Sequence, residues 1–379
     1  MGNLFFVFTP LQLFVAQQII RQENLGNNIL LYTHIGNHYD FYEIYNIMYI
    51  DDLWKEKIKF EGIEKIMELN LYNPKELWQA HKKYRQLNKI AKQHKIRTIY
   101  LGEILNQTCR MSAIYFSKRK YKVVFFEEGT SHYINRPFTL KNSYVEKIKY
   151  LIFDNFCFEP LFGVKFAKWH CSPNRPYDDI PIDKRFSIIP YHNKPFDVRL
   201  GVQPLLSSKL EEYIDSNIQY KNERRVMLMT DPMRELMPKE YLYLYFETIK
   251  ECIEGINPNK TLYIKFHPRE LDESRERILQ IVQDSGMKFR VLSKEINICV
   301  EYYLQKYHFD DIYFFNAATF FYNGYAFPKT NFIKLMPVVY KKCKEVGLTN
   351  LTYMENMLKM IEPFSLDEMV AIQEKYRHE

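Results

Sequence analysis

Short apolar segments alternate with helical segments along this chain, and the alternation occurs twice. The first half predicts strands at 4–8, 29–33, 98–101 and 122–126, with helices at 12–22, 41–48 and 74–94. The second half predicts strands at 226–230, 261–266, 312–315 and 331–335, with helices at 239–254, 274–284 and 366–376. Apolar strands alternating with helices are typical of parallel sheets covered on both faces. We therefore expect an α/β protein with two Rossmann-like, doubly wound parallel-sheet domains.

The length agrees with two domains, because 379 residues exceed what one hydrophobic core usually supports. From about residue 158 to residue 204 the alternation gives way to segments rich in proline and asparagine, which break regular elements. We place an N-terminal domain at 1–190, a linker at 191–205 and a C-terminal domain at 206–379. The terminal helix is free to pack back on the N-terminal domain.

The charge favours an anionic partner. A net charge of +7 suits an anionic ligand, a nucleic acid or an anionic membrane surface. The basic, aromatic-rich stretch 141–169 either lies on a bilayer surface, as a peripheral membrane contact, or is an ordinary helix followed by a domain-closing segment. The 30 tyrosines and 28 phenylalanines are either stacking surfaces or the result of a coding bias.

The cysteines and the N-terminus indicate the compartment. Six scattered cysteines without a C-x-x-C pair predict neither a zinc site nor a disulfide framework. The first apolar run, 4–8, is too short for a signal sequence, and no run reaches about 18 apolar residues. We expect a cytoplasmic protein, at the inner face of the cell membrane if 141–169 binds lipid. Removal of a native anchor before Met1 is left open.

Two predicted strands end in chemically active tripeptides, Glu127-Glu128-Gly129 and His267-Pro268-Arg269. In open α/β sheets ligands bind beyond the carboxyl ends of the strands. Pro268 biases His267 toward an extended backbone, and an imidazole there can donate a proton or a hydrogen bond to a departing phosphate. The alternative is a histidine that is satisfied by a carbonyl at the start of a loop.

Three carboxylates are candidates for a general base, a group that would accept a proton from a hydroxyl. Glu127 and Glu128 point to opposite sides of an extended segment, so only one faces a given side. Burial beside neighbouring phenylalanines would raise the pKa of that glutamate toward the range useful for deprotonating a sugar hydroxyl. Asp231 also follows a strand. The alternatives are a solvated acidic pair at 127–128 and an Asp-Pro turn at Asp231.

A third strand end, 314–319, contains small and polar residues that let a phosphate approach the backbone, namely Asn316, Ala317 and Thr319. The start of an ordinary helix would look the same. Several motifs are absent from the sequence, including G-x-x-x-x-G-K-[ST], G-x-G-x-x-G, H-E-x-x-H and D-x-D. Their absence favours transfer without a metal ion.

Taken together, these segments resemble the bacterial sialyltransferases of glycosyltransferase family 52, which act on lipooligosaccharide and capsule precursors. The segment 6–13 resembles the family's N-terminal strand and Thr-x-Leu-Gln turn, and 38–42 its Tyr-Asp-Tyr-Tyr segment. The segment 126–130 resembles its Phe-Asp-Asp-Gly-Thr, 267–269 its His-Pro-Arg, and 314–317 its Phe-Phe-Ser-Gly. Asn316 stands where the family has serine.

The resemblance implies a GT-B fold, whose two domains face each other across a cleft, and CMP-sialic acid as the donor substrate, with no cofactor and no metal. It implies inversion at the anomeric carbon and an oligosaccharide or glycolipid acceptor ending in galactose or a similar sugar. The N-terminal domain, 1–190, would then be the acceptor side, and the C-terminal domain, 206–379, would bind the CMP-sugar. A homodimer is possible in this family. His267 would stabilise or protonate the leaving CMP, and Asp231, Glu127 or Glu128 would be the base. The donor-binding residues would be His267, Pro268, Arg269, Glu295, Asn316, Ala317, Thr319, Thr9 and Gln12.

The sequence is also compatible with two other functions. One is a related GT-B enzyme that moves another donor sugar, such as glucose, or that polymerises sialic acid. The other is a basic, tyrosine-rich protein that stacks nucleic-acid bases on aromatic side chains. The chain lacks an RNP-like aromatic motif and a concentrated Lys/Arg stripe, so we expect no nucleic-acid partner.

Overall fold

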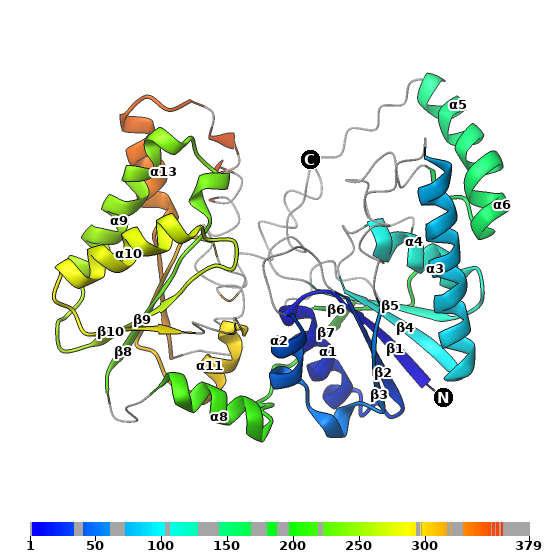
Figure 1. Ribbon diagram of the computed structural model, residues 1–379, viewed down its shortest axis with the longest axis horizontal. Helices are drawn as coiled ribbons and strands as arrows, with labels where there is room; N and C mark the ends of the chain where they lie inside the picture. The colour runs from blue at the N-terminus through cyan, green and yellow to red at the C-terminus, as the bar shows by residue number, and fades with distance from the viewer. Residues whose placement is uncertain are drawn as a thin grey trace. The chain divides into compact units, whose positions relative to one another are not determined.

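The computed structural model of the protein forms two compact units, each with its own parallel sheet (Figure 1). The first unit contains residues 1–36 and 49–201, and the second contains 37–48 and 202–379. The structure describes residues 2–33, 41–60, 73–102, 107–127, 144–167, 180–187, 197–218, 223–292, 296, 298–316, 319, 329–349, 351–352, 354–355 and 358. The predicted terminal helix at 366–376 lies outside these residues.

The sheet of the first unit has seven strands in the order β3-β2-β1-β4-β5-β6-β7, and every described pairing is parallel. The strands are β1 (Gly2–Val7), β2 (Asn28–Tyr32), β3 (Glu56–Lys59), β4 (Ile96–Gly102), β5 (Lys122–Phe126), β6 (Lys184–Ser187) and β7 (Asp197–Arg199). The helices are α1 (Pro10–Gln22), α3 (Pro74–Gln93), α4 (Gln107–Ser117), α5 (Tyr144–Phe153) and α6 (Glu159–Phe162). A π-helical turn, η4 (Asp154–Phe158), joins α5 to α6.

Both faces of this sheet are buried, because successive side chains of a strand point to opposite faces. Leu4 and Phe6 of β1 join one core cluster together with buried residues of α3 and α4. Phe5, between them, stacks on Tyr100 with ring centroids 4.1 Å apart, on the other face. Two helices start where the sequence offers an N-cap followed by proline, at Thr9-Pro10 and Asn73-Pro74.

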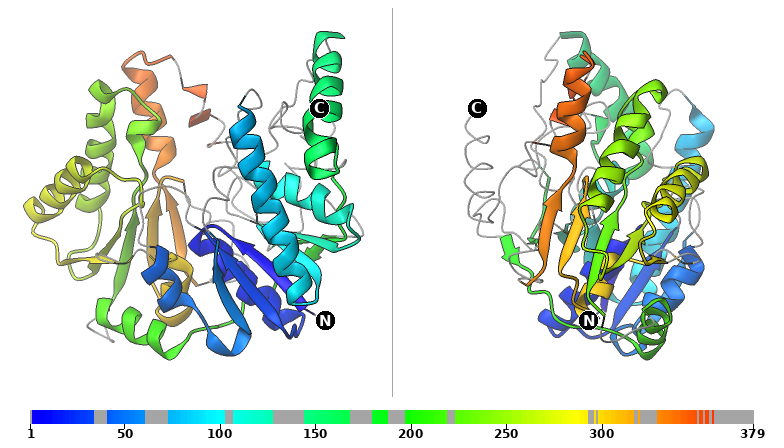
Figure 2. Two further views of the ribbon diagram at one scale, coloured as in Figure 1. Left: turned by 45° about the vertical axis from the view of Figure 1, so that its right-hand side comes forward. Right: turned by 90° about the vertical axis from the view of Figure 1, so that its left-hand side faces the viewer.

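The sheet of the second unit has five parallel strands in the order β10-β9-β8-β11-β12. They are β8 (Arg225–Met229), β9 (Thr261–Lys265), β10 (Phe289–Leu292), β11 (Asp311–Phe314) and β12 (Asn331–Lys334). The helices are α2 (Phe41–Met48), α8 (Ser208–Asn217), α9 (Leu242–Glu254), α10 (Asp272–Asp284), α11 (Val300–Lys306) and α13 (Met336–Glu345). Helix α9 contacts both α10 and α13, and Figure 2 shows the three together.

The two parallel-sheet units confirm the predicted α/β class. The prediction missed four strands, β3, β6, β7 and β10. Of these, β6 and β7 lie in the stretch that the sequence suggested to be irregular. Strands β6 and β7 are four and three residues long and carry a charged side chain inward, so neither shows an apolar run. The buried Arg185 of β6 donates to the buried Asp197 of β7 at 2.8 Å (Nε to Oδ1), which explains how both charges are accommodated.

Helix α2 lies between strands of the first unit in sequence but belongs to the second unit. It contacts α8, and the hydroxyl of Ser207 donates to the carbonyl of Ile47 at 3.3 Å. The alternating pattern places no boundary there, because a helix between two strands looks the same whichever sheet it covers.

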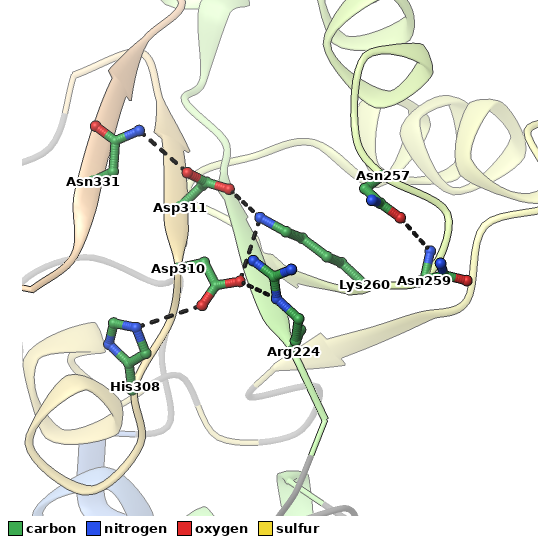
Figure 3. A network of polar contacts seen from close by, with 8 residues as sticks. All are labelled: Arg224, Asn257, Asn259, Lys260, His308, Asp310, Asp311 and Asn331. Carbon is green, nitrogen blue, oxygen red and sulfur yellow. Dashed lines mark hydrogen bonds and ion pairs between the residues drawn. The ribbon is translucent and has the colours of Figure 1, made fainter.

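The amino ends of the second sheet are held by a charged network (Figure 3). The ammonium of Lys260, just before β9, lies 2.6 Å from Asp311 and 3.3 Å from Asp310, at the start of β11. Arg224, just before β8, pairs with Asp310 at 3.0 Å, and Asn331 of β12 donates to Asp311 at 3.2 Å. These contacts join four strands at the amino ends of the sheet. Ligands of open α/β sheets bind at the opposite, carboxyl ends of the strands.

Candidate active site

Each sheet contains one point where the strand order reverses. In the first unit the chain builds β2 and β3 on one side of β1, and then β4 to β7 on the other. In the second unit it builds β9 and β10 on one side of β8, and then β11 and β12 on the other. Ligands of open α/β sheets bind beyond the carboxyl ends of strands at such points. The two candidate places are therefore the carboxyl ends of β1 and β4, and those of β8 and β11.

At the reversal point of the second unit, Asp231 and Asn316 meet. Asp231 lies two residues after β8, and its Oδ2 accepts the backbone N–H of Asn316, which lies two residues after β11, at 2.8 Å. The side-chain oxygen of Asn316 is buried and has no hydrogen-bond partner among the described residues. The site therefore offers one unused acceptor beside a carboxyl group.

His267 lies on the other side of Asp231, two residues after β9. Its backbone N–H donates to the hydroxyl of Thr230 at 3.0 Å, which links the ends of β8 and β9. The backbone N–H of Arg269 donates to His267 Nδ1 at 3.1 Å. An Nδ1 that accepts a hydrogen bond leaves the proton of the neutral ring on Nε2. The ring is thus prepared as a hydrogen-bond donor through Nε2.

The electrostatics keep this ring neutral in the protein without ligand. Burial, reinforced by the nearby cations Arg269, Lys265 and Arg275, lowers the pKa of His267 from 6.5 to about 3. At neutral pH the ring therefore donates a hydrogen bond rather than carrying a charge. The positive field of the same three cations would favour an anion bound at the donor.

A buried network below the His-Pro-Arg turn contains Asp231, Tyr245 and Glu270. The backbone N–H of Glu270 donates to the carbonyl of His267 at 2.9 Å, and its carboxylate accepts the hydroxyl of Tyr245 at 3.3 Å. The hydroxyl oxygen of Tyr245 accepts the backbone N–H of Asp231 at 3.4 Å. The turn that carries His267 thus ends at Glu270, which is only 5% exposed and whose carboxylate joins the turn to Tyr245.

Both carboxyl groups of this network hold their protons more tightly than usual. Burial, and then the nearby charge of Glu270, raises the pKa of Asp231 to about 8, although the hydrogen bond from Asn316 opposes this. Burial raises the pKa of Glu270 to about 7, against hydrogen bonds from Thr230 and Tyr245. Strongly shifted carboxyls at a ligand-binding edge are typical of functional sites.

The reversal point of the first unit carries Thr9 and Gln12. The Thr9 hydroxyl accepts the Gln12 N–H at 3.2 Å, and Gln12 Oε1 accepts the Phe8 N–H at 2.6 Å. The Gln12 side chain covers Gly102 at the end of β4, so that a Cβ at Gly102 would lie 2.5 Å from Gln12 Cδ. The Nε2 of Gln12 is buried and has no partner among the described residues. Glu127, fully buried, follows β5 at the same carboxyl edge of this sheet.

The other predicted residues lie as follows. Pro268 is half-buried in the turn, and Arg269 is exposed and pairs with Glu235 at 2.7 Å. The hydroxyl of Thr319 donates to the buried Glu301 at 2.6 Å, so this hydroxyl is occupied within the protein. Glu128, Glu295 and Ala317 lie outside the described residues, as does 38–40 of the Tyr-Asp-Tyr-Tyr-like segment.

Sequence reasoning missed Glu270, Tyr245 and a second buried group, in which Lys265 lies near Glu301. Burial lowers the pKa of Lys265 to about 8, while the charge of Glu301 opposes this. For Glu270 a signal was available, because it directly follows the His-Pro-Arg motif. Tyr245 lies on a helix at a position that looks like an ordinary interior residue, and Glu301 is a helix glutamate that the sequence alone would place at the surface.

Comparisons with known proteins agree with this architecture. The family model described as Alpha-2,8-polysialyltransferase (POLYST) matches residues 3–335. The comparison with curated proteins found no match. A solved structure from Listeria monocytogenes, described as a candidate UDP-N-acetylglucosamine 2-epimerase, has 10% identity and a TM-score of 0.50, with 99% of this chain and 96% of that chain covered.

Two further solved structures are similar in the same way. A UGT transferase from Siraitia grosvenorii in complex with UDP has 9% identity and a TM-score of 0.47, covering 99% of this chain and 95% of that chain. The UDP-GlcNAc 2-epimerase from Methanocaldococcus jannaschii has 13% identity and a TM-score of 0.42, and the match covers 100% of both chains.

The likeness to the Listeria protein covers both units and confirms the predicted GT-B fold class. The family match supports a bacterial sialyltransferase family, although it does not single out family 52, which the motifs resembled. Fold and family together identify a glycosyltransferase. The chain belongs to the alpha-2,8-polysialyltransferase family.

Proposed function

We propose that this protein is a metal-independent, inverting sialyltransferase that moves sialic acid from CMP-sialic acid to the end of a cell-surface glycan. The observation that carries the proposal is His267, a neutral Nε2–H donor at the carboxyl edge of the second sheet, in the positive field of Arg269, Lys265 and Arg275. The family match supports sialic acid as the transferred sugar.

The chemistry follows from where charge develops. When CMP leaves, the sugar becomes an oxocarbenium-like centre that already bears a carboxylate, and new negative charge forms on the phosphate. A preorganised neutral donor such as His267, with cations nearby, stabilises that charge without a metal ion. The unused oxygen of Asn316 is available to a hydroxyl or amino group of the donor. Removing one such stabilising donor typically lowers turnover by about 10² to 10³.

The acceptor is the less defined substrate, and two candidates are distinguishable. The motifs suggest a terminal galactose of lipooligosaccharide or capsule. The family match favours the alternative in which the acceptor is itself a terminal sialic acid and the product is a polymer. Glu127 in the first unit and Asp231 in the second are the described base candidates. A transferase of another donor sugar, such as glucose, is the remaining enzymatic alternative.

The test is incubation of the protein with CMP-sialic acid and either oligosialic acid or a panel of galactosides, with product mass as the readout. UDP-glucose in place of CMP-sialic acid tests the other donor class, and EDTA tests metal independence. Growth of oligosialic acid by sialic-acid units would assign polymerisation, and a sialylated galactoside would assign the simple transfer. Sugar transfer from UDP-glucose alone would contradict the proposal.

Variants test the residues. His267→Ala should lower cleavage of CMP-sialic acid by about 10² to 10³, whereas His267→Asn, which keeps a neutral N–H donor, should lose less. The matched control is His308→Ala, because His308 lies at the opposite edge of the same sheet beside Asp310. Near-normal turnover of His267→Ala would remove this residue from the mechanism.

The base is tested by comparing Glu127→Gln with Asp231→Asn. Loss of a general base usually costs about 10² to 10⁴ in rate. The variant with the larger loss of transfer, at unchanged donor binding, identifies the base. If both variants keep more than about a tenth of the wild-type rate, neither residue is the base.

A further inference from the structure

One surface of the first unit is unusually apolar. Of the ten large hydrophobic side chains that are exposed among the described residues, five lie on α5 and the turn that follows it. We call this surface the α5 apolar face; it consists of Val145 (70% exposed), Ile148 (42%), Leu151 (64%), Ile152 (49%) and Phe156 (77%). Single exposed hydrophobic residues are ordinary, but a contiguous group of them marks an interaction surface.

The helix is held so that this face points outward. Tyr150, Phe153 and Phe158, on its other side, pack in the core cluster of the first unit or against it. The carboxylate of Asp154 accepts the backbone N–H of Phe166 at 2.7 Å and that of Ala167 at 2.9 Å. Figures 1 and 2 show the segment along the outside of its unit, running into α6. Both sides of the helix are therefore apolar, and among the described residues only one of them packs into the core.

Lysines border the α5 apolar face. Residues of an α-helix are separated by about 100° around its axis, so Val145, Ile148, Leu151 and Ile152 form one arc. Lys147 and Lys149 lie at its two flanks, and Lys147 is exposed. Long basic side chains at the borders of an apolar arc can reach anionic headgroups while the arc enters the interface.

The dimensions fit a helix that lies along a membrane surface. Helix α5 has ten residues and the following turn five, about 22 Å at 1.5 Å per residue. A hydrocarbon core of about 30 Å is thicker than that. Within the described part of the chain, no helix is both long enough and apolar enough to cross a bilayer.

A second copy of the chain fits this surface less well. Most homodimer interfaces are two-fold and place the same patch of both copies against each other. Such a contact would bring the flanking lysines of one copy close to those of the other, and like charges across an interface weaken binding. An anionic lipid surface can bury the apolar arc and attract the flanking lysines. We propose that the α5 apolar face binds the anionic surface of a lipid bilayer, with the helix in the plane of the interface.

The experiment measures binding of the full-length chain to vesicles by sedimentation. Vesicles of phosphatidylcholine alone are compared with vesicles that contain about a third of phosphatidylglycerol, because anionic lipid attracts basic side chains. Binding to anionic vesicles should be stronger and should fall with added salt. The variant Ile152→Glu/Phe156→Glu should weaken it at least about tenfold. The matched control, Tyr243→Glu/Val338→Glu, changes two exposed hydrophobic residues of the second unit and should bind like wild type.

A second measurement does not depend on how well the glutamate variants fold. In Phe156→Trp, the tryptophan emission should shift to shorter wavelength when anionic vesicles are added, because the ring leaves water. Lys147→Glu should weaken binding to anionic vesicles and leave binding to neutral ones unchanged.

Three outcomes would overturn the proposal. They are no binding to anionic vesicles, equal loss in the matched control, and a wild-type dimer in light scattering that the Ile152→Glu/Phe156→Glu variant converts to a monomer. The last result would assign the face to a second copy of the chain. None of these measurements uses sugar transfer. A failure of the membrane-binding proposal can therefore be distinguished from a failure of the proposed sialyltransferase activity.

Discussion

Replacing Asp231 by asparagine should make the stability of the protein less dependent on pH. The pKa of Asp231 is raised from 3.8 to about 8, mainly by burial. The folded protein therefore keeps this proton over a pH range in which the unfolded chain has released it. Since the unfolded state binds fewer protons there, the free energy of unfolding falls as the pH rises. The stabilisation is fully present below the unfolded pKa and is lost as the pH rises to about 8.

The size of the effect follows from the shift. Each pH unit between the two pKa values changes the free energy of unfolding by about 1.4 kcal/mol. From about pH 5 to about pH 7 the Asp231 contribution is therefore about 2.7 kcal/mol. With a urea dependence of about 3 kcal/mol per molar, this corresponds to about 0.9 M in the unfolding midpoint. Asparagine resembles the protonated acid and has no such titration.

The assay is urea unfolding at about pH 5 and pH 7, followed by far-ultraviolet circular dichroism, of wild type, Asp231→Asn and the exposed control Glu273→Gln. The urea concentration at the unfolding midpoint should fall between about pH 5 and pH 7 for wild type and for the control. For Asp231→Asn it should fall by about 0.9 M less. An asparagine variant with the full wild-type pH dependence, and with lower stability than wild type at pH 7, would refute the reasoning.

Three further changes test other contacts. Glu270→Ala removes the carboxylate that accepts hydrogen bonds from Tyr245 and Thr230 beside the His-Pro-Arg turn, and should lower donor cleavage by about ten- to a hundredfold while circular dichroism stays unchanged; wild-type cleavage would show that this carboxylate does not position His267. Gly102→Ala should cost about 1–3 kcal/mol in urea unfolding, because its Cβ would lie 2.5 Å from Gln12 Cδ; wild-type stability would mean that the glutamine moves freely. Arg185→Leu leaves Asp197 buried without its partner and should cost about 3–5 kcal/mol, most of it recovered when Asp197→Leu is added.

Much of the fold could be predicted because most strands are apolar runs and two helices begin at an N-cap residue followed by proline. Strand β5 matches the predicted 122–126 run, and α1 follows its Thr9-Pro10 start. Strands β6 and β7 were not readable, because their short sequences contain inward charges that are acceptable only as a pair. That pairing is a tertiary contact, and no local pattern encodes it.

The sequence predicted the residues of the candidate site at the strand ends, but not the buried residues that pack against them. Strand-end position suggested His267, Asp231 and Asn316, and the structure brings Asp231 into contact with Asn316. The sequence suggested a histidine that titrates near neutrality, whereas burial and neighbouring cations lower its pKa to about 3. Such an environment depends on side chains from several strands and helices, and a single motif does not contain it.

Helix α2 has a consequence for any attempt to divide the protein. Its eight residues come from the first half of the sequence and complete the second unit beside α8. A fragment that starts at residue 202 therefore lacks one of its own helices and leaves bare the side of α8 that α2 covers. Isolated expression of the C-terminal portion calls for α2 to be supplied, either fused ahead of residue 202 or added as a peptide.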